Sequence, residues 1–278
     1  MKRNRKLAGG IAAAALAAAL LCAAAQAADG AERLRVWVDG RRADAEGNSF
    51  LLDGEAYVPL REVSEALGAT AVVWEPATAT AWAEADGLAL TVRAGDVYLT
   101  ANGRYLYVPG TCILLDGYMM VPASALAKAF GAGCALDEAK GEVHLTSGGP
   151  PAAPASEAYD ETDLYWLSRI IFAESGGESF LSQIAVGSVV MNRVRSGLFP
   201  DTVKGVIFDR KYGLQFTPVG NGSIYNTPTD SCVIAAKLAL DGAAPVGNSL
   251  YFALADCSCW ASRNRPFVAS IGCQAFYA

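Results

Sequence analysis

The residue best suited to acid–base chemistry in this chain is Glu174, within the segment Ala173-Glu174-Ser175-Gly176-Gly177-Glu178. Apolar residues at helical spacing precede it, so we expect a helix whose buried face ends at this carboxyl group. Burial disfavours the charged form of a carboxylic acid and raises its pKa, so that it can donate a proton to a leaving group near neutral pH. The pair Gly176-Gly177 should end the helix and leave Glu174 at its mouth.

Structural roles compete with the catalytic one for both acidic residues of this segment. Glu174 can instead pair with a nearby arginine, either Arg169 or Arg193. Glu178 stands beside the expected start of the next helix, where a carboxylate complements the helix dipole without any chemistry. A carboxyl group held by a guanidinium keeps a low pKa, so the two roles of Glu174 predict different surroundings.

Two helices are expected to position this acid. The first carries apolar residues at helical spacing between 164 and 171, with Thr162 or Asp163 as its cap. The second begins near Ser179 and ends at Ser196-Gly197. Its stripe of small and apolar residues is typical of packing against the first helix.

The histidine count excludes most competing hydrolase chemistries. His144 is the single histidine, and it is expected to face solvent from the alternating strand pattern of residues 142–145. Residues 149–278 contain none. Zinc amidases need imidazole ligands, and cysteine or serine hydrolases need a histidine base. We therefore expect neither a metal nor an organic cofactor.

The first 27 residues have the pattern of an export signal. Basic residues at positions 2–6 precede an apolar stretch over residues 7–25, and Ala25-Gln26-Ala27 is a small-x-small cleavage pattern. Cleavage after Ala27 predicts a secreted protein without stable membrane insertion. The alternative is an uncleaved anchor, because the apolar run approaches the ~20 residues that span a bilayer.

The charge balance argues against nucleic acid and anionic lipid as partners. The chain has 22 basic and 28 acidic residues, and loss of the four basic residues in the signal changes the net charge from −6 to −10. Phosphate binding needs clustered Lys and Arg, which this chain lacks. An anionic wall polymer would have to be held by local contacts. We expect the protein to be a monomer.

Six cysteines remain after the signal, with an even number in each half of the chain. In an exported protein this count predicts disulfides. Cys112 with Cys134 is the single choice in the first half. The second half allows three pairings among Cys232, Cys257, Cys259 and Cys273.

A linker at residues 147–157, SGGPPAAPASE, separates two expected domains. With 53% hydrophobic residues, the chain can form a core in each. We predict an α+β fold class, with a β-rich domain at residues 31–146 and a mainly helical domain with a small β element at residues 158–278.

The first domain contains a repeat at an offset of 63 residues. In each copy Asp-Gly indicates a tight turn, proline suits the first helical position, and glycine suits the helix C-cap. Each copy should therefore form a strand, turn, strand and short helix. The repeated elements are LLDG at 51–54 and 114–117, Val-Pro at 58–59 and 121–122, and Gly-Ala at 68–69 and 131–132.

These repeated elements resemble the stalk domain of bacterial surface proteins, also called the copper amine oxidase N-terminal-like domain, over about residues 31–146. Copper is not implied here, because one histidine without a His/Cys/Met cluster cannot build a copper site. The resemblance implies a spacer or a weak wall-binding module.

The second domain contains an ordered series of further short elements, at 173–178, 183–186, 191–194, 199–200, 202–203, 205–207, 215–216, 221–224, 235–236, Pro245, 249–252, Trp260, 265–266 and 271–272. With these elements, residues 163–277 resemble the SleB-type cell wall hydrolases, the spore-cortex-lytic enzyme family. The resemblance implies a lysozyme-like, mainly helical domain that cleaves peptidoglycan glycan strands, with Glu174 as the catalytic acid.

The family typically closes with a histidine two residues after the Ile-Gly pair, where this chain has Gln274. Glutamine donates and accepts hydrogen bonds but does not titrate near neutral pH. We interpret this position as structural or substrate-contacting rather than as an essential base. Amide and aromatic side chains suited to sugar recognition are Gln183, Gln215, Phe216, Asn221, Tyr251, Trp260 and Gln274.

The predicted reaction is cleavage between N-acetylmuramic acid and N-acetylglucosamine by a lytic transglycosylase, in spore cortex or cell wall remodelling. This route needs one carboxylate, whereas hydrolysis normally needs a second, either ~5 Å or ~6.5–9.5 Å away. The alternative function is a non-catalytic wall-binding protein with a decayed hydrolase domain. Candidates for a second carboxylate are Glu178, Asp201, Asp209, Asp230 and Asp256.

Overall fold

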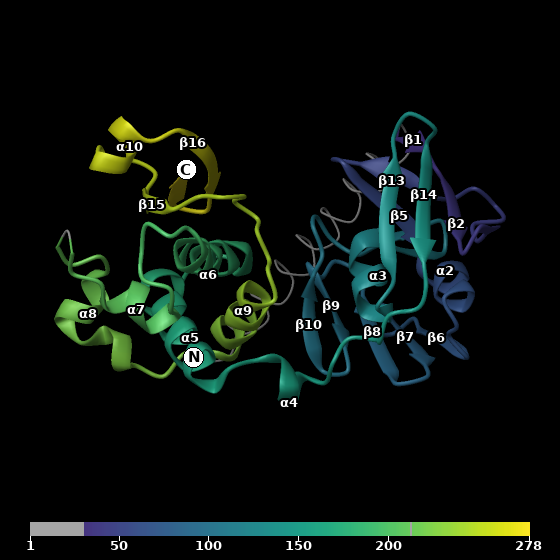
Figure 1. Cartoon of the computed structure of the whole chain (residues 1–278), viewed down its shortest axis with the longest axis horizontal. Coiled ribbons are helices and arrows are strands. Elements are labelled where there is room, and N and C mark those ends of the chain that lie inside the picture. The colour runs from purple at the N-terminus through teal and green to yellow at the C-terminus, as the bar shows by residue number, and fades with distance from the viewer. Residues whose placement is uncertain (1–30, 212) are drawn as a thin grey trace, which may run out of the picture. The chain divides into compact units, whose positions relative to one another are not determined.

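The computed structural model describes residues 31–211 and 213–278, in two compact units (Figure 1). One unit ends at Pro154 and the other begins at Ala155. The predicted export signal and its cleavage site lie outside the described residues. The units are a β-rich N-terminal one and a mainly helical C-terminal one with a small sheet, which confirms the α+β fold class.

Three sheets build the described part of the N-terminal unit, and the alternation of buried and exposed residues along the strands explains why they form. In β8, Leu88, Leu90 and Val92 are buried while Ala89 and Arg93 are exposed, as expected for a strand with one face on the core. The first sheet has the order β1 (Glu32–Arg33), β4 (Phe50–Leu52), β5 (Glu55–Pro59), β12 (Tyr118–Pro122), β11 (Ile113–Leu115). The second is β10 (Arg104–Tyr107), β9 (Tyr98–Ala101), β8 (Leu88–Arg93), β7 (Thr80–Ala85), β6 (Ala71–Glu75). The third is β13 (Gly133–Asp137), β14 (Glu142–Thr146), β2 (Arg35–Val38), β3 (Arg41–Arg42).

The two sequence copies form hairpins that lie side by side. Asp53-Gly54 joins β4 to β5 and Asp116-Gly117 joins β11 to β12, and all four residues have positive φ, as type I′ turns require. Strand β5 pairs antiparallel with β12, with Val58 opposite Val121. Each hairpin leads directly into a helix, α2 (Leu60–Ala66) or α3 (Ala123–Phe130). The prolines cap these helices one position earlier than the sequence suggested.

The cysteines differ from the sequence prediction. All six in the described residues are free thiols, so the expected disulfides are not formed there. Cys112 is buried, with its sulfur 3.9 Å from the carbonyl oxygen of Tyr98, whereas Cys134 is exposed on β13. An even count does not bring thiols within reach, because a disulfide needs Cα atoms about 4.4–6.8 Å apart.

The single histidine lies on the surface of the third sheet. His144 is exposed on β14, its ring stacks on Trp37, and its Nε2 lies 3.2 Å from the Glu142 carboxylate. These neighbours give His144 a structural role on a solvent-facing strand.

The C-terminal unit is centred on three helices that pack against one another, α5 (Glu161–Ser175), α6 (Phe180–Arg195) and α9 (Asp230–Leu240). The Asp160 side chain caps α5 by accepting the Asp163 N–H, so the helix begins earlier than its predicted cap, Thr162 or Asp163. Ser179 caps α6 as predicted. The other elements are α4 (Ala155–Ala158), α7 (Val203–Phe208), α8 (Thr217–Asn221), η1 (Ser223–Tyr225) and α10 (Trp260–Asn264).

A three-stranded sheet completes this unit, in the order β15 (Tyr251–Leu254), β17 (Gln274–Tyr277), β16 (Phe267–Ile271). Phe276 of β17 is fully buried in a cluster with Ala185 and Val189 of α6. This contact brings the start of β17 close to the end of α5, where Glu174 lies.

The close packing of the three central helices depends on Gly187 of α6. A Cβ at this position would lie 2.8 Å from Cδ1 of Ile171 on α5 and 2.9 Å from Cβ of Ala239 on α9. We therefore expect Gly187→Val to destabilise the C-terminal unit by about 1–3 kcal/mol, the usual cost of overpacking a core. Calorimetric unfolding of the full chain measures this. Gly177→Ala is the control, because its Cβ would meet nothing within 4 Å, and equal melting of both variants contradicts the packing argument.

Candidate functional site

Glu174 lies in the last turn of α5 and is half-buried. Leu167, Ile170 and Ile171, earlier on the same helix, are fully buried. Burial raises the pKa of Glu174 above its ordinary value, and the charge of Arg193 opposes this rise. The surroundings thus favour the protonated form that a general acid requires.

No ion pair holds the Glu174 carboxylate among the residues that the structure describes. Arg169, one of the two arginines considered as partners, donates to the carbonyl oxygen of Tyr165 and lies 3.6 Å over the ring of that residue. Arg193 influences the pKa of Glu174 without forming a salt bridge to it. The structural alternative for Glu174, a clasp with a guanidinium, is therefore not present.

The Glu174 side chain borders a pocket of about 210 Å³. Helices α5 and α6 contribute one residue each, and the remainder come from the segment 215–217 and the strands β15 and β17. Of the described residues that line it, Glu174 is the only carboxylic acid. The lining residues are Glu174, Arg193, Gln215, Phe216, Thr217, Phe252, Ala253, Leu254 and Gln274.

Arg193 is a site residue that sequence reasoning considered merely as an ion-pair partner. It is 5% exposed, and its Nε donates to the carbonyl oxygen of Leu250 at 2.7 Å. Burial lowers its pKa to about 10, so the guanidinium remains charged at neutral pH. The signal was available in the sequence, since Arg193 follows Val186, Val189 and Val190 on the buried stripe of α6.

Gln274 connects the three elements around the acid. It is 5% exposed on β17, its Oε1 accepts the Ser182 hydroxyl of α6 at 2.8 Å, and its Nε2 donates to the backbone carbonyl of Glu174 at 3.3 Å. Its amide thus uses one acceptor and one donor to fix the end of α5. Gln274 also lines the pocket.

Glu178 contacts the turn between β16 and β17 rather than the pocket. Its Oε2 accepts the backbone N–H of Cys273 at 3.4 Å, and a Cβ on Gly272 would lie 2.6 Å from the same oxygen. Gly272 has φ +60°, a conformation that also favours glycine. The other candidates for a second carboxylate, Asp201, Asp209, Asp230 and Asp256, are likewise not among the residues that line the pocket.

The predicted sugar-binding residues divide into two groups. Gln215, Phe216 and Gln274 line the pocket beside Glu174, and Phe216 is buried. Gln183, Asn221, Tyr251 and Trp260 do not line it. The pocket therefore brings together three of the seven.

The four outlying residues have other contacts. The Gln183 amide donates to the Glu178 carbonyl, and the Asn221 side chain accepts the Ser223 N–H in a turn. The rings of Tyr251 and Trp260 are 5.6 Å apart, and Trp260 is 54% exposed.

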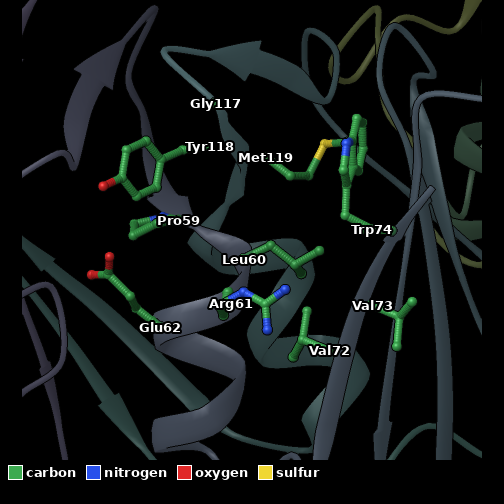
Figure 2. Close-up of a pocket in the computed structure, with 11 residues that line it drawn as sticks. Pro59, Leu60, Arg61, Glu62, Val72, Val73, Trp74, Gly117, Tyr118 and Met119 are labelled. Carbon is green, nitrogen blue, oxygen red and sulfur yellow. The ribbon is translucent and has the colours of Figure 1, made fainter. Parts of the chain in front are cut away.

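A second hollow, of about 150 Å³, lies in the N-terminal unit between the first sheet, α2 and the second sheet (Figure 2). Figure 2 shows the Met119 side chain pointing toward the Trp74 ring, with the Glu62 carboxylate and the Tyr118 hydroxyl on the other side. Burial, together with the charges of Glu46 and Asp44, raises the pKa of Glu62. The lining is Pro59, Leu60, Arg61, Glu62, Val72, Val73, Trp74, Ala81, Gly117, Tyr118 and Met119.

Neither unit contains, in its described part, a group of three or more His, Cys, Asp or Glu residues arranged to hold a metal ion. Within residues 31–211 and 213–278, no helix combines the length and apolar character needed to cross a bilayer.

Comparison with protein families confirms both resemblances. Residues 177–277 match the cell wall hydrolase family, and residues 37–145 match the copper amine oxidase N-terminal domain. The C-terminal part of the chain therefore belongs to the cell wall hydrolase family, and the part before it is similar to the copper amine oxidase N-terminal domain.

Curated proteins similar to this chain include spore cortex-lytic enzymes. The enzyme of Oceanobacillus iheyensis is 38% identical over 106 residues, covering 38% of this chain and 37% of the relative. That of Bacillus cereus is 42% identical over 94 residues, covering 34% and 35%. That of Bacillus subtilis is 35% identical over 101 residues, covering 36% and 32%. The matches thus span about a third of these relatives' length.

Among solved structures, the catalytic domain of the germination-specific lytic transglycosylase SleB from Bacillus anthracis is 36% identical. The match covers 44% of this chain and 98% of that one, with a TM-score of 0.40. The catalytic domain of the Bacillus cereus SleB protein is also 36% identical, and the match covers 94% of it with the same TM-score.

Proposed function

We propose that this protein cleaves the glycan strands of peptidoglycan between N-acetylmuramic acid and N-acetylglucosamine, as a lytic transglycosylase with Glu174 as general acid and base. The observation that carries the proposal is a half-buried carboxyl group without an ion pair, in a pocket whose described lining has no second carboxylate. Membership of the cell wall hydrolase family and the spore cortex-lytic relatives support the substrate class.

In the proposed first step, protonated Glu174 transfers its proton to the glycosidic oxygen as the bond from that oxygen to C1 of the muramic residue breaks. In the second, the resulting glutamate accepts the proton of the muramic 6-hydroxyl, whose oxygen forms a new bond to C1. The sugar is released with a 1,6-anhydro end, and Glu174 is protonated again. Raised by burial and moderated by Arg193, the pKa of Glu174 suits a group that must give and then regain one proton.

The neighbouring side chains support recognition of an uncharged sugar. The amide of Gln215 can bind hydroxyl or acetamido groups, and Phe216 and Phe252 supply apolar surface within the same pocket. Gln274 acts mainly through the backbone of Glu174. Sugar contacts by Gln183, Asn221, Tyr251 and Trp260 stay predictions for more distant parts of the strand.

We further propose that the protein acts as a secreted monomer on peptidoglycan outside the cytoplasmic membrane. The spore cortex-lytic relatives make the cortex the first substrate to test, beside vegetative wall. A decayed, purely wall-binding protein is the weaker alternative, because the pocket keeps an unpaired acid with a raised pKa.

The test is digestion of purified cortex and vegetative peptidoglycan, followed by turbidity and by mass spectrometry of the products. We expect muropeptides that end in 1,6-anhydromuramic acid. Free reducing ends would contradict the transglycosylase route, because water rather than the 6-hydroxyl would then have attacked C1. Absence of clearing with either wall type would favour the binding alternative.

A further inference from the structure

The guanidinium of Arg193 is held firmly on one side and has unused hydrogen-bond donors. Its Nε bonds to Leu250, and its central carbon lies 4.8, 5.2 and 5.7 Å from the ring centroids of Phe199, Phe216 and Tyr251. The buried Nη1 has no hydrogen-bond partner in the described part of the chain. Leaving donors of a buried charge unpaired is costly, so a ligand that supplies an acceptor gains more here than at the surface.

We propose that Arg193 forms a subsite for the carbonyl oxygen of the 2-acylamino group on the sugar bound beside Glu174. This inference rests on the glycan substrate proposed above. Arg193 and Glu174 line the same pocket. The subsite makes Arg193 a specificity-determining residue. It selects an acylated amino sugar over a sugar with a hydroxyl at the same carbon.

The chemistry of the pocket favours a carbonyl over the other groups on a glycan. A guanidinium is a donor without any acceptor, so its ligand must be an acceptor. An anionic group would meet the Glu174 carboxyl group in the same pocket once that group ionises. The apolar side chains of Phe216, Phe252 and Leu254 suit the alkyl part of an acyl group. With the alkyl part against them, the carbonyl oxygen of the acyl group would face the guanidinium of Arg193.

Two oligosaccharides that differ at this group test the subsite without relying on catalysis. The β-1,4-linked tetrasaccharides of N-acetylglucosamine and of glucose are both uncharged, and they differ in having acetamido or hydroxyl groups at C2. Their affinities for the full chain carrying Glu174→Gln are measured by calorimetric titration. We expect the acetylated ligand to bind about tenfold or more tightly, as loss of one hydrogen bond to a charged group predicts.

The variant Arg193→Lys, made in the same background, keeps a positive charge but loses the planar fork of donors. We expect the preference for the acetylated ligand to fall to about threefold or less. Thermal unfolding verifies that the Arg193→Lys variant is folded. The two ligands are also compared on the protein that keeps Arg193, and that comparison does not depend on how the substitution affects folding.

The proposal is overturned if the two ligands bind equally, if the acetylated ligand does not bind, or if folded Arg193→Lys keeps the full preference. Failure of the proposed function gives a different result. In that case wall digestion is absent, yet the acetylated tetrasaccharide is still preferred in an Arg193-dependent way.

Discussion

Replacing Glu174 by glutamine is expected to lower the rate of peptidoglycan digestion by about 10²–10⁴-fold, the usual contribution of a positioned general acid. Glutamine keeps the size and hydrogen-bonding shape of the side chain but cannot transfer the proton. The backbone carbonyl of Glu174, which accepts from Gln274, is unaffected by the substitution. The loss should therefore be chemical rather than structural, with unfolding unchanged.

Glu178→Gln is the matched control for this experiment. It removes a carboxylate four residues away that contacts the turn at Cys273 and does not line the pocket. Initial rates of turbidity loss, normalised to folded protein, compare the two variants with wild type. If Glu174→Gln clears peptidoglycan as fast as wild type, Glu174 has no part in the mechanism. If Glu178→Gln loses more activity than Glu174→Gln, Glu178 rather than Glu174 is the catalytic acid.

The pH profile of the wild-type enzyme carries the same expectation. Burial raises the pKa of Glu174 above its ordinary 4.5, so the acid stays protonated to higher pH than an exposed glutamate. Because the first step needs the protonated form, kcat/KM should fall as the pH rises through this pKa. The midpoint of that alkaline limb should lie above 4.5, and a midpoint at or below it would contradict the role of burial.

Local structure near the acid was predictable because short-range patterns determine it. The apolar spacing before Glu174, the Gly176-Gly177 break and the Ser179 cap define the ends of α5 and α6 closely. The Asp-Gly turns of the N-terminal unit followed in the same way from the conformations that Asp and Gly tolerate.

The lining of the pocket was less predictable because it depends on tertiary contacts. Gln215 and Phe216 line the same pocket as Glu174 because of the tertiary fold, and no local sequence pattern indicates this. Trp260 is an equally plausible sugar-binding residue by type, but it does not line the pocket. The disulfide prediction failed for a related reason. The number of cysteines does not indicate how far apart they lie in the fold. Cys112 is in the core, whereas Cys134 is on the surface.

Arg193 and Gln274 show how a buried polar residue acquires its full role through tertiary contacts, which the sequence indicates only in part. Each lies on an element whose other inward side chains are mainly apolar, and each uses part of its hydrogen-bonding capacity to hold a backbone carbonyl, of Leu250 or of Glu174. The charge of Arg193 thus influences the pKa of Glu174, and the amide of Gln274 holds the backbone of Glu174.

The bridging geometry of Gln274 predicts a second large effect. Gln274→Leu leaves the Ser182 hydroxyl and the Glu174 carbonyl without the partners they have in the wild type. Buried groups left unpaired cost about 1–3 kcal/mol each, and the end of α5 should shift to relieve them. A displacement of a catalytic group by about 1 Å can lower the rate about 10²-fold. We therefore expect digestion to slow by roughly that factor, with a larger change in kcat than in KM.

Gln274→His is the conservative counterpart, since a neutral imidazole also offers one donor and one acceptor. We expect it to restore both bonds and to leave the digestion rate within about threefold of wild type at neutral pH, where most of an unperturbed histidine is uncharged. Kinetics on soluble glycan fragments, with thermal unfolding of each variant, separate positioning from stability. Full activity in Gln274→Leu would show that α5 holds Glu174 without the bridge. An inactive but folded Gln274→His would instead show that the amide itself contacts the sugar, because imidazole would have preserved the bridge to Ser182 and the Glu174 backbone.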